Sequence, residues 1–370
     1  MSIDRYQREA PVPHAHILDI APYVGGEATI AGAQRVIRLA SNESALGPSA
    51  KAMAAYREQA ADLFRYPDGG STELRRAIAA RYSLDAERVV CGTGSDELIS
   101  LLARCYAAPG DEVLYSRHGF LMYPIAAQAV GATPVAVPEL NLTADPDAIL
   151  AHVTPRTRLI FLANPNNPTG TYLSRDVVRR LHQKLPPDAI LVLDAAYAEF
   201  VDRNDYEAGL ELAERAPNVV MLRTFSKIHA LAGLRVGWAY GSAAIADVLN
   251  RTRGTFNVGL PAQAAAIASL ADTEALQRAY DHNNRWRPWL EDAIRALGLE
   301  VNPAVANFVL VKFGNPPKHA DDARQFLKSR AILVRQMGAY NLPEYLRITV
   351  GTEEENRAVV AALAEFAAAK

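Results

Sequence analysis

The stretch VVMLRTFSKIHALAGLRVGWAY, residues 219–240, decides the fold. Its first apolar run, 219–222, predicts a buried strand that ends in a turn with two hydroxyl side chains. A single lysine, Lys227, follows this turn, and Arg235 stands at the head of a second apolar run. A lysine at the end of a buried strand, beside hydroxyl groups and an arginine, indicates an amine that forms a Schiff base next to a phosphate.

Short apolar runs bounded by turns indicate further strands, and helical periodicity fills the segments between them. The runs LIFLA (159–163) and ILVLD (190–194) have almost no polar alternation, which is typical of strands buried on both faces. The pattern therefore predicts an α/β fold with a mostly parallel seven-stranded sheet between helices. The expected strands are 88–91, 112–115, 133–137, 159–163, 190–194, 219–222 and 235–240.

Three regions of the chain differ in pattern. Prolines and a Gly-Gly pair break residues 1–44 repeatedly, which predicts an irregular N-terminal arm. Residues 45–258 carry the alternating strands and helices of a large domain. Residues 259–370 begin with a long helical stretch and continue with strands and helices, as expected for a smaller α+β C-terminal domain.

The composition excludes several classes of protein. Of 370 residues, 22% are charged and the net charge is -2, so there is no basic surplus for nucleic acid. Two cysteines, Cys91 and Cys105, lack metal-ligand spacing and are expected to pack as small apolar residues, with no metal bound. The N-terminus lacks the apolar run of a signal peptide, and no stretch approaches the roughly 18 apolar residues of a membrane span. We therefore expect a cytoplasmic protein.

Polar side chains follow four of the expected strands. In an open α/β sheet, ligands bind at the carboxyl ends of the strands. Taken alone, each group has an ordinary explanation, because Asp194 could cap a helix, Tyr197 could pack in the core and Lys227 could be solvated. The groups are GTGSD (92–96), NPNNPTG (164–170), Asp194 with Tyr197, and TFSK (224–227).

Together these residues match the needs of pyridoxal 5′-phosphate. Its phosphate requires hydroxyl, amide and guanidinium donors. Its aldehyde requires a lysine, its ring nitrogen an acid, and its ring oxygen hydrogen-bond donors. The set divides into an anion cradle, an amine, and a carboxylate with a phenol and an amide. These are Ser95, the backbone of Asp96, Thr224, Ser226 and Arg235 for the cradle, Lys227 for the amine, and Asp194, Tyr197 and Asn167 for the third group.

The chain resembles the fold-type I, class II aminotransferases that use this cofactor, and over nearly its whole length the histidinol-phosphate aminotransferase family. The serine-lysine pair with NPNNPTG and D-x-x-Y is highly specific for the superfamily, and the other motifs are moderately specific for the family. The motifs, in family order, are LASNESALGPS (39–49), FRYPDGG (64–70), GTGSDELI (92–99), NPNNPTG (164–170), LDAAYAEF (193–200), LRTFSKIHALAGLRVG (222–237) and LRITVGTEEEN (346–356).

The resemblance implies a role for each cofactor residue. Lys227 binds the cofactor covalently and then moves the substrate proton as general acid and base. Asp194 keeps the ring nitrogen protonated, while Tyr197 and Asn167 bind the ring oxygen. Phe120, where the family often has a tyrosine, stacks on the ring. The cradle residues bind the phosphate.

The resemblance also implies a homodimer with shared sites. Tyr66, in RYPDGG, would reach the phosphate of the cofactor in the neighbouring subunit. One position departs from the family, since Ala195 stands where a glutamate is usual. That position points away from the cofactor in the family, so we give it no weight.

Two arginines near the C-terminus are candidates for the substrate end. Arg335 and Arg347 both adjoin expected strands and could be surface ion pairs or an anion pocket, in which a phosphate can use both guanidinium groups. By resemblance, Arg347 grips the substrate anion and Arg335 assists. Tyr23 and Asn42 are family-like lining residues, and Tyr23 could instead be a packed aromatic of the arm. Asn307 is expected to face the same region.

The leading substrates are L-histidinol phosphate and 2-oxoglutarate, which would give imidazole acetol phosphate and L-glutamate in histidine biosynthesis. The segment QMGAYNLPEY (336–345) resembles paralogues that transaminate phenylalanine and tyrosine, so an aromatic amino acid aminotransferase stays open. A decarboxylase of threonine phosphate shares the scaffold. A transcriptional regulator lacks a basic helix before the domain, and a nucleotide-binding loop at 92–94 lacks its third glycine.

Overall fold

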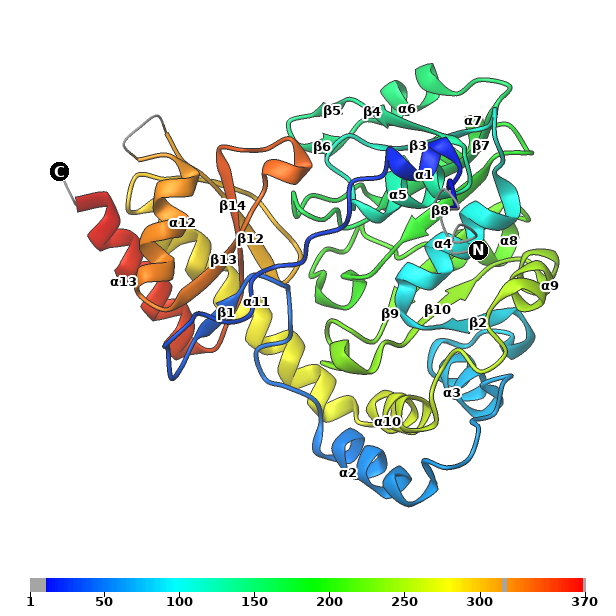
Figure 1. Ribbon diagram of the computed structural model, residues 1–370, viewed down its shortest axis with the longest axis horizontal. Helices are drawn as coiled ribbons and strands as arrows, with labels where there is room; N and C mark the ends of the chain where they lie inside the picture. The colour runs from blue at the N-terminus through cyan, green and yellow to red at the C-terminus, as the bar shows by residue number, and fades with distance from the viewer. Residues whose placement is uncertain (1–10, 315–317, 369–370) are drawn as a thin grey trace, which may run out of the picture.

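The computed structural model describes residues 11–314 and 318–368, and these form two units joined by a long helix (Figure 1). The large unit contains a seven-stranded sheet and the small unit a five-stranded sheet, while β5 and β6 form a separate hairpin. Among the described residues, no helix is both long and apolar enough to cross a membrane. The chain passes from the arm to the small sheet, then to the large unit, and returns to the small unit along α11 (Thr273–Arg295).

The large sheet has the strand order β2-β10-β9-β8-β7-β3-β4. Neighbours from β4 to β9 pair in parallel, and β10 runs antiparallel to both β2 and β9. The expected mostly parallel α/β sheet is confirmed. The strands are β2 (Val89–Gly92), β3 (Glu112–Ser116), β4 (Thr133–Val137), β7 (Thr157–Ala163), β8 (Ile190–Asp194), β9 (Val219–Thr224) and β10 (Gly237–Tyr240).

One expected strand begins two residues late. The strand predicted at 235–240 starts at Gly237 because Arg235 has a left-handed backbone with φ of 54°. That conformation ends the short helix η4 (Ala232–Leu234) and turns the Arg235 side chain back toward Ser226. The strand prediction was wrong at this end because an arginine that follows a leucine looks like the first residue of an apolar run.

Apolar cores cover both faces of the large sheet. Alternate residues of β7 face opposite sides, so Ile160 and Leu162 belong to one core and Leu159 and Phe161 to the other. This explains why LIFLA has no polar alternation. The helices that pack into the first core are α3 (Thr72–Tyr82), α6 (Pro146–His152), α7 (Arg175–Lys184), α8 (Leu210–Arg215) and α10 (Leu260–Ala271). Those in the second are α4 (Gly94–Tyr106), α5 (Met122–Ala129) and α9 (Ala243–Thr252).

The small sheet takes its edge strand from the N-terminal arm. Its order is β1-β13-β14-β12-β11, with β1 (Ile37–Leu39) parallel to β13 and the other neighbours antiparallel. The arm is thus not irregular throughout, although three residues are too few to show a strand pattern. The remaining strands are β11 (Glu300–Asn302), β12 (Phe308–Lys312), β13 (Ile332–Gln336) and β14 (Tyr345–Thr349). Helices α11, α12 (Ala320–Ser329) and α13 (Glu353–Ala368) share one core with them.

The division between the two units falls near α10 and α11. Helix α10 packs against α2 (Ala50–Glu58) and α3, on the side of the large sheet, and α11 then carries the chain into the small unit. A domain limit at 258/259 stays a prediction. The remaining short elements are α1 (Ala15–Leu18), β5 (Glu139–Leu140), β6 (Thr143–Ala144), η1 (Gln59–Asp62), η2 (Ala86–Arg88), η3 (Ala198–Phe200) and η5 (Gly338–Tyr340).

Candidate active site

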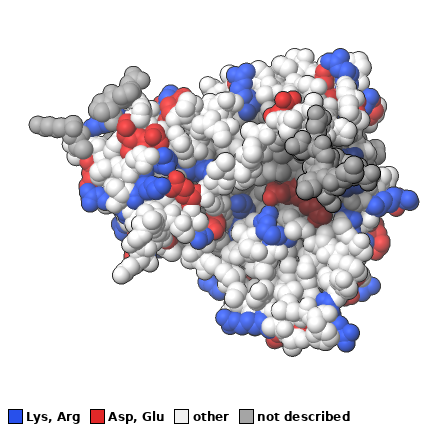
Figure 2. Space-filling view, viewed as in Figure 1, with Lys and Arg blue, Asp and Glu red and all other residues white. Residues whose placement is uncertain are grey.

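A cavity of about 370 Å³ lies where the two units meet, at the carboxyl ends of β8 and β9. Figure 2 shows Lys and Arg side chains next to Asp and Glu side chains near the middle of this face. The structure brings all but two of the predicted site residues to the cavity wall. These are Tyr23, Asn42, Ser95, Asp96, Phe120, Asn167, Asp194, Tyr197, Thr224, Ser226, Lys227, Arg235, Arg335 and Arg347.

Two predicted residues lie elsewhere. Tyr66 is 82% exposed, does not line the cavity and stacks on Phe256 with ring centroids 4.6 Å apart. Within one chain it therefore contributes nothing to the site. Asn307 does not face the cavity either, because its side chain donates to the backbone carbonyl of Asn42 at 3.1 Å. That prediction was wrong because the amide is used inside the protein, where β12 meets the segment after β1.

The anion cradle forms where α4 begins and β9 ends. Arg235 Nη2 donates to Asp96 Oδ2 at 3.1 Å, and Arg235 Nη1 donates to Ser226 Oγ at 3.3 Å. Thr224 Oγ1 also donates to Ser226 Oγ, at 3.0 Å. Gly94 has φ of +78°, and a Cβ there would come within 2.6 Å of Arg235 Nη2. Hydroxyl groups, a guanidinium and the N-terminus of a 13-residue helix thus converge, which suits a phosphate.

The acid of the site is Asp194, at the end of β8 and only 5% exposed. Tyr123 Oη donates to Asp194 Oδ2 at 2.8 Å, and the Ala196 amide donates to Oδ1 at 3.2 Å. Burial raises the pKa of Asp194 to about 6, against the opposing effect of these hydrogen bonds. A buried carboxylate of this kind is stabilised by a cationic partner, and a protonated ring nitrogen is one.

The amine and the phenol lie beside each other. Lys227 Nζ is 5.5 Å from the ring centroid of Tyr197 and donates to the backbone carbonyl of Ser41 at 3.3 Å. The phenol oxygen of Tyr197 accepts a hydrogen bond from Asn42 Nδ2 at 2.9 Å. Phe120 is partly buried and meets the ring of Tyr123 edge-on. The predicted aromatic face, amine and ring-oxygen donors therefore share one cavity.

At the other end, the two predicted arginines lie directly opposite each other on neighbouring strands. Arg335 of β13 is the cross-strand partner of Arg347 of β14. Arg347 is buried, donates to Asn167 Oδ1 and to the carbonyl of Ala40 at 2.8 Å, and burial lowers its pKa. Among the described residues, nothing accepts a hydrogen bond from Arg347 Nε. Like charges directly opposite are destabilising, so an anion between them would stabilise the pair.

The N-terminal arm closes this end of the cavity. Tyr23 lies under the guanidinium of Arg335, with 6.0 Å from Cζ to the ring centroid, and meets the ring of Phe120 edge-on. Arg335 Nη2 donates to the carbonyl of Val24 at 2.6 Å. The arm thus contacts both the substrate end and the aromatic face.

The chain matches the model of a family described as aminotransferase class I and II over residues 34–363. It belongs to this family. It is also 58% identical to histidinol-phosphate aminotransferase of Paramagnetospirillum magneticum, over 97% of this chain and 99% of that relative. Identity to the same enzyme of Rhodospirillum centenum is 57%, over 96% and 98%.

A solved structure shares the fold over its whole length. Histidinol-phosphate aminotransferase from Sinorhizobium meliloti, in complex with pyridoxal-5′-phosphate, has a TM-score of 0.88 and 29% identity, covering 99% of both chains. The expected fold-type I architecture of this aminotransferase is confirmed. No group of His, Cys, Asp or Glu in the described part of the chain could hold a metal ion.

Two tyrosines that line the cavity of this aminotransferase were not predicted. Tyr123 is fully buried and stacks on Phe161 at 4.7 Å, so it looks like a core residue until its hydroxyl is followed to Asp194. Tyr340 is buried near both arginines, and burial raises its pKa to about 12. His118 Nδ1 lies 2.7 Å from the carbonyl of Tyr340 and so ties the two units together. Tyr340 lies in the segment 336–345, and its place between the two arginines in the sequence was the one feature that could have pointed to a role in the site.

Proposed function

We propose that this aminotransferase moves the amino group of L-histidinol phosphate to 2-oxoglutarate, with pyridoxal 5′-phosphate as cofactor, in histidine biosynthesis. The products are imidazole acetol phosphate and L-glutamate. One observation carries the proposal: a single cavity has a lysine, an acid and an anion cradle at one end and two opposed arginines at the other. Relatives at 57–58% identity over nearly the full chain are histidinol-phosphate aminotransferases, which supports this choice of substrate.

The residues of the cofactor end each have a physical task. When bound, pyridoxal 5′-phosphate supplies a carbonyl that takes up the amine and a ring that accepts electrons from the substrate carbon. Lys227 holds the cofactor and moves the proton as general acid and base. Asp194 holds a proton on the ring nitrogen, because a buried carboxylate favours a cationic neighbour. Tyr197 and Asn167 donate to the ring oxygen.

The phosphate and the ring face are held by separate groups. Phe120 covers one face of the ring. The phosphate is bound by the helix N-terminus, which includes the backbone amide of Asp96, and by cradle side chains that donate hydrogen bonds. These side chains are Ser95, Thr224, Ser226 and Arg235.

The substrate end favours a doubly charged anion. One arginine is enough for a carboxylate, because the two groups match in a bidentate pair. Two opposed guanidinium groups, Arg335 and Arg347, suit a phosphate, which carries more charge and more acceptor oxygens. The distal carboxylate of 2-oxoglutarate uses the same pair in the second half of the reaction. Tyr23 covers this end from the arm.

An aromatic amino acid aminotransferase is the second candidate, because Tyr340 adds an aromatic side chain to the cavity wall near the two arginines. The two functions are separated by measuring kcat/KM for histidinol phosphate, phenylalanine and tyrosine with 2-oxoglutarate as acceptor. We expect kcat/KM for histidinol phosphate to exceed that of both amino acids at least about tenfold, since it is the only one of the three donors with a phosphate that can use the second arginine. A preference for phenylalanine would overturn the choice of substrate.

The proposal includes a homodimer in the cytoplasm. Tyr66 is exposed beside Leu63 and Phe64, which are also more than half exposed, and such a group of apolar side chains suits a protein interface. In the dimer Tyr66 reaches the cofactor phosphate of the partner subunit. Light scattering should give twice the chain mass of 40.2 kDa. A monomer with full activity would contradict the shared site.

A further inference from the structure

Three consecutive residues after β1 contact three groups of the proposed site. Strand β1 belongs to the small sheet, so this segment enters the cavity from the small unit. Each residue of the segment contacts a different group of the site. The backbone carbonyl of Ala40 accepts from Arg347 at 2.8 Å, and the backbone carbonyl of Ser41 accepts from Lys227 at 3.3 Å. The side-chain amide of Asn42 donates to the hydroxyl of Tyr197 at 2.9 Å.

Asn42 is the residue of this segment that the protein holds most firmly. It is 1% exposed, with a left-handed φ of 56°, a conformation that asparagine tolerates better than most residues. Its amide N–H donates to Thr349 Oγ1 at 3.0 Å, and its carbonyl accepts from Asn307 Nδ2 at 3.1 Å. These bonds fix the Asn42 backbone beside β14.

The hydrogen bonds also fix which end of the Asn42 side chain faces Tyr197. The hydroxyl of Thr349 donates to Asn42 Oδ1 at 3.2 Å, so the amide oxygen faces the small sheet. The amide nitrogen, which can only donate, then faces the oxygen of Tyr197. The phenol oxygen accepts that bond, and the proton of the phenol is left to donate in another direction.

We propose that Asn42 is a positioning residue that turns the hydroxyl of Tyr197 so that its proton points at the ring oxygen of the bound cofactor. The inference rests on the proposed function, which places the cofactor next to Tyr197. A hydroxyl that accepts a hydrogen bond is also a stronger donor. Asn42 was expected to line the substrate site, but both of its amide atoms are bonded within the protein, so it acts through Tyr197.

The proposal predicts a shift in the pH titration of the bound cofactor's visible absorbance. The titrating proton is shared between the ring oxygen and the nitrogen of the lysine link. A weaker donor at the ring oxygen leaves that proton more tightly held, so the midpoint pH rises. Replacing Asn42→Gly, which keeps the positive φ but removes the amide, should raise the midpoint by about half a unit to one unit.

Two further variants separate positioning from a general structural effect. Thr349→Val removes the hydroxyl that orients the Asn42 side chain but leaves Asn42 and Tyr197 themselves in place. It should therefore raise the midpoint in the same direction as Asn42→Gly, by a smaller amount. Tyr197→Phe should raise the midpoint at least as much as Asn42→Gly, and the double variant should match Tyr197→Phe alone, because the amide then has no phenol to orient.

The outcomes distinguish this inference from the proposed function. An unchanged midpoint in Asn42→Gly, or an equal further rise when it is added to Tyr197→Phe, would overturn the positioning role. If the parent gains no visible absorbance with pyridoxal 5′-phosphate, the proposed function itself fails. Should Asn42→Gly not fold, Asn42→Asp keeps an acceptor for Thr349, cannot donate when ionised, and should raise the midpoint in the same direction.

Discussion

The two ends of the cavity are built in different ways. The cofactor end comes from one sheet, because the cradle and Asp194 follow neighbouring strands of the large unit. The substrate end is assembled from the arm, the segment after β1 and the opposed strands β13 and β14. The first end is supported by one sheet with a core on each face, whereas the second depends on how separate stretches of chain pack.

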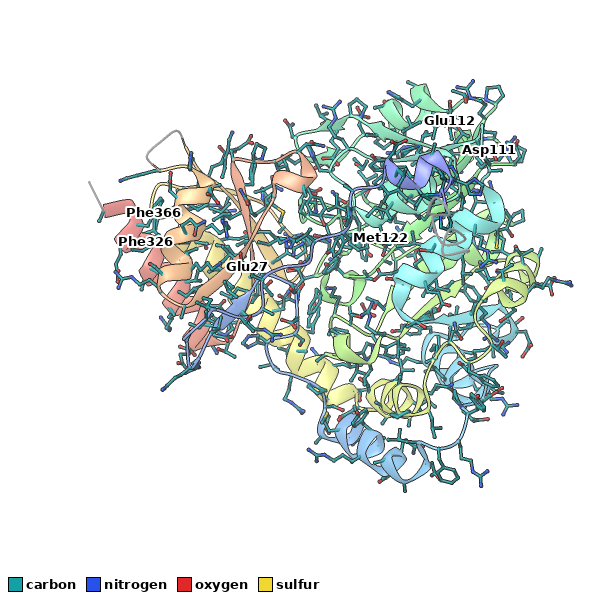
Figure 3. All side chains as sticks on the ribbon, in the orientation of Figure 1. Glu27, Asp111, Glu112, Met122, Phe326 and Phe366 are labelled. Carbon is teal, nitrogen blue, oxygen red and sulfur yellow. The ribbon has the colours of Figure 1, made fainter. Side chains whose placement is uncertain are left out.

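Before β1, the arm contacts the small unit through partly exposed ion pairs. Glu27, marked in Figure 3 beside the small unit, forms ion pairs with Arg324 at 3.4 Å and Lys328 at 2.6 Å. Glu27 is nearly half exposed, and such pairs contribute at most about 1 kcal/mol. The substrate end can therefore be altered with little effect on the cofactor end, and the predictions below test this contrast.

The largest effect is expected at the amine. Lys227→Ala should reduce turnover at least about a thousandfold, because both the covalent link and the proton carrier are lost. The variant should also lose the visible absorbance of the bound cofactor. Lys184→Ala, at the exposed end of α7, is the matched control and should keep both. Full activity in Lys227→Ala would contradict the proposed function.

The arginine pair should separate the two ends of the cavity. Arg347 is buried and Arg335 is partly exposed, so removing Arg347 has the larger effect. For histidinol phosphate, kcat/KM should fall several hundredfold in Arg347→Ala, or about 3 to 4 kcal/mol, and about tenfold in Arg335→Ala. Equilibrium titration should find cofactor affinity nearly unchanged in Arg335→Ala. A large drop in cofactor affinity of Arg335→Ala would contradict the independence of the two ends.

Asp194 gives the cofactor end a pH dependence when the cofactor is absent. Its pKa is raised from 3.8 to about 6, so the folded protein holds this proton more tightly than the unfolded chain. The stabilisation is complete below pH 3.8 and is lost as the pH rises through about 6, a change of about 3 kcal/mol.

The Asp194→Asn variant does not lose this stability as the pH rises, because its side chain carries no ionisable proton. Relative to the parent, the free energy of unfolding of the cofactor-free variant should be higher at pH 7 than at pH 4 by about 2 kcal/mol, since the unfolded chain is already partly ionised at pH 4. Denaturant unfolding of both proteins at equal concentrations measures this difference. A constant difference at the two pH values would show that burial of Asp194 does not penalise its charge.

The sequence predicts the cofactor end well for a physical reason. Lys227 and Asp194 follow apolar runs, and parallel strands bring their carboxyl ends to one edge of a sheet. Tyr123 could not be found this way, because 71 positions separate it from Asp194 and its neighbours are apolar. Strand β1 was missed for a related reason, since its three residues gain their partner only from β13.

The sequence also could not predict in which direction a side chain points. Asn42 was correctly expected near the cavity, but its orientation follows from hydrogen bonds to Thr349 and Asn307, both more than 260 positions away. Arg235 was expected to open a strand, and its left-handed backbone depends on the turn that it closes. Motifs therefore locate residues, while packing between distant segments decides which atoms face each other.

The smallest effect is expected at the start of α4. A Cβ on Gly94 would lie 2.6 Å from Arg235 Nη2, and its φ of +78° is unfavourable for alanine. Gly94→Ala should therefore displace Arg235 from the cradle and weaken cofactor binding about tenfold, or 1 to 2 kcal/mol. Equilibrium titration with pyridoxal 5′-phosphate measures the change.

Gly110 provides a matched control for Gly94→Ala. It also has a positive φ, of +97°, but a Cβ there would meet nothing within 4 Å. Gly110→Ala should lower stability through backbone strain and leave cofactor affinity unchanged, because Gly110 lies outside the cavity. If both variants weakened cofactor binding equally, strain spreading through the large unit would explain the effect. A loss of cofactor affinity in Gly94→Ala alone would instead assign the effect to the contact with Arg235, as expected for an end whose parts are held by a single sheet.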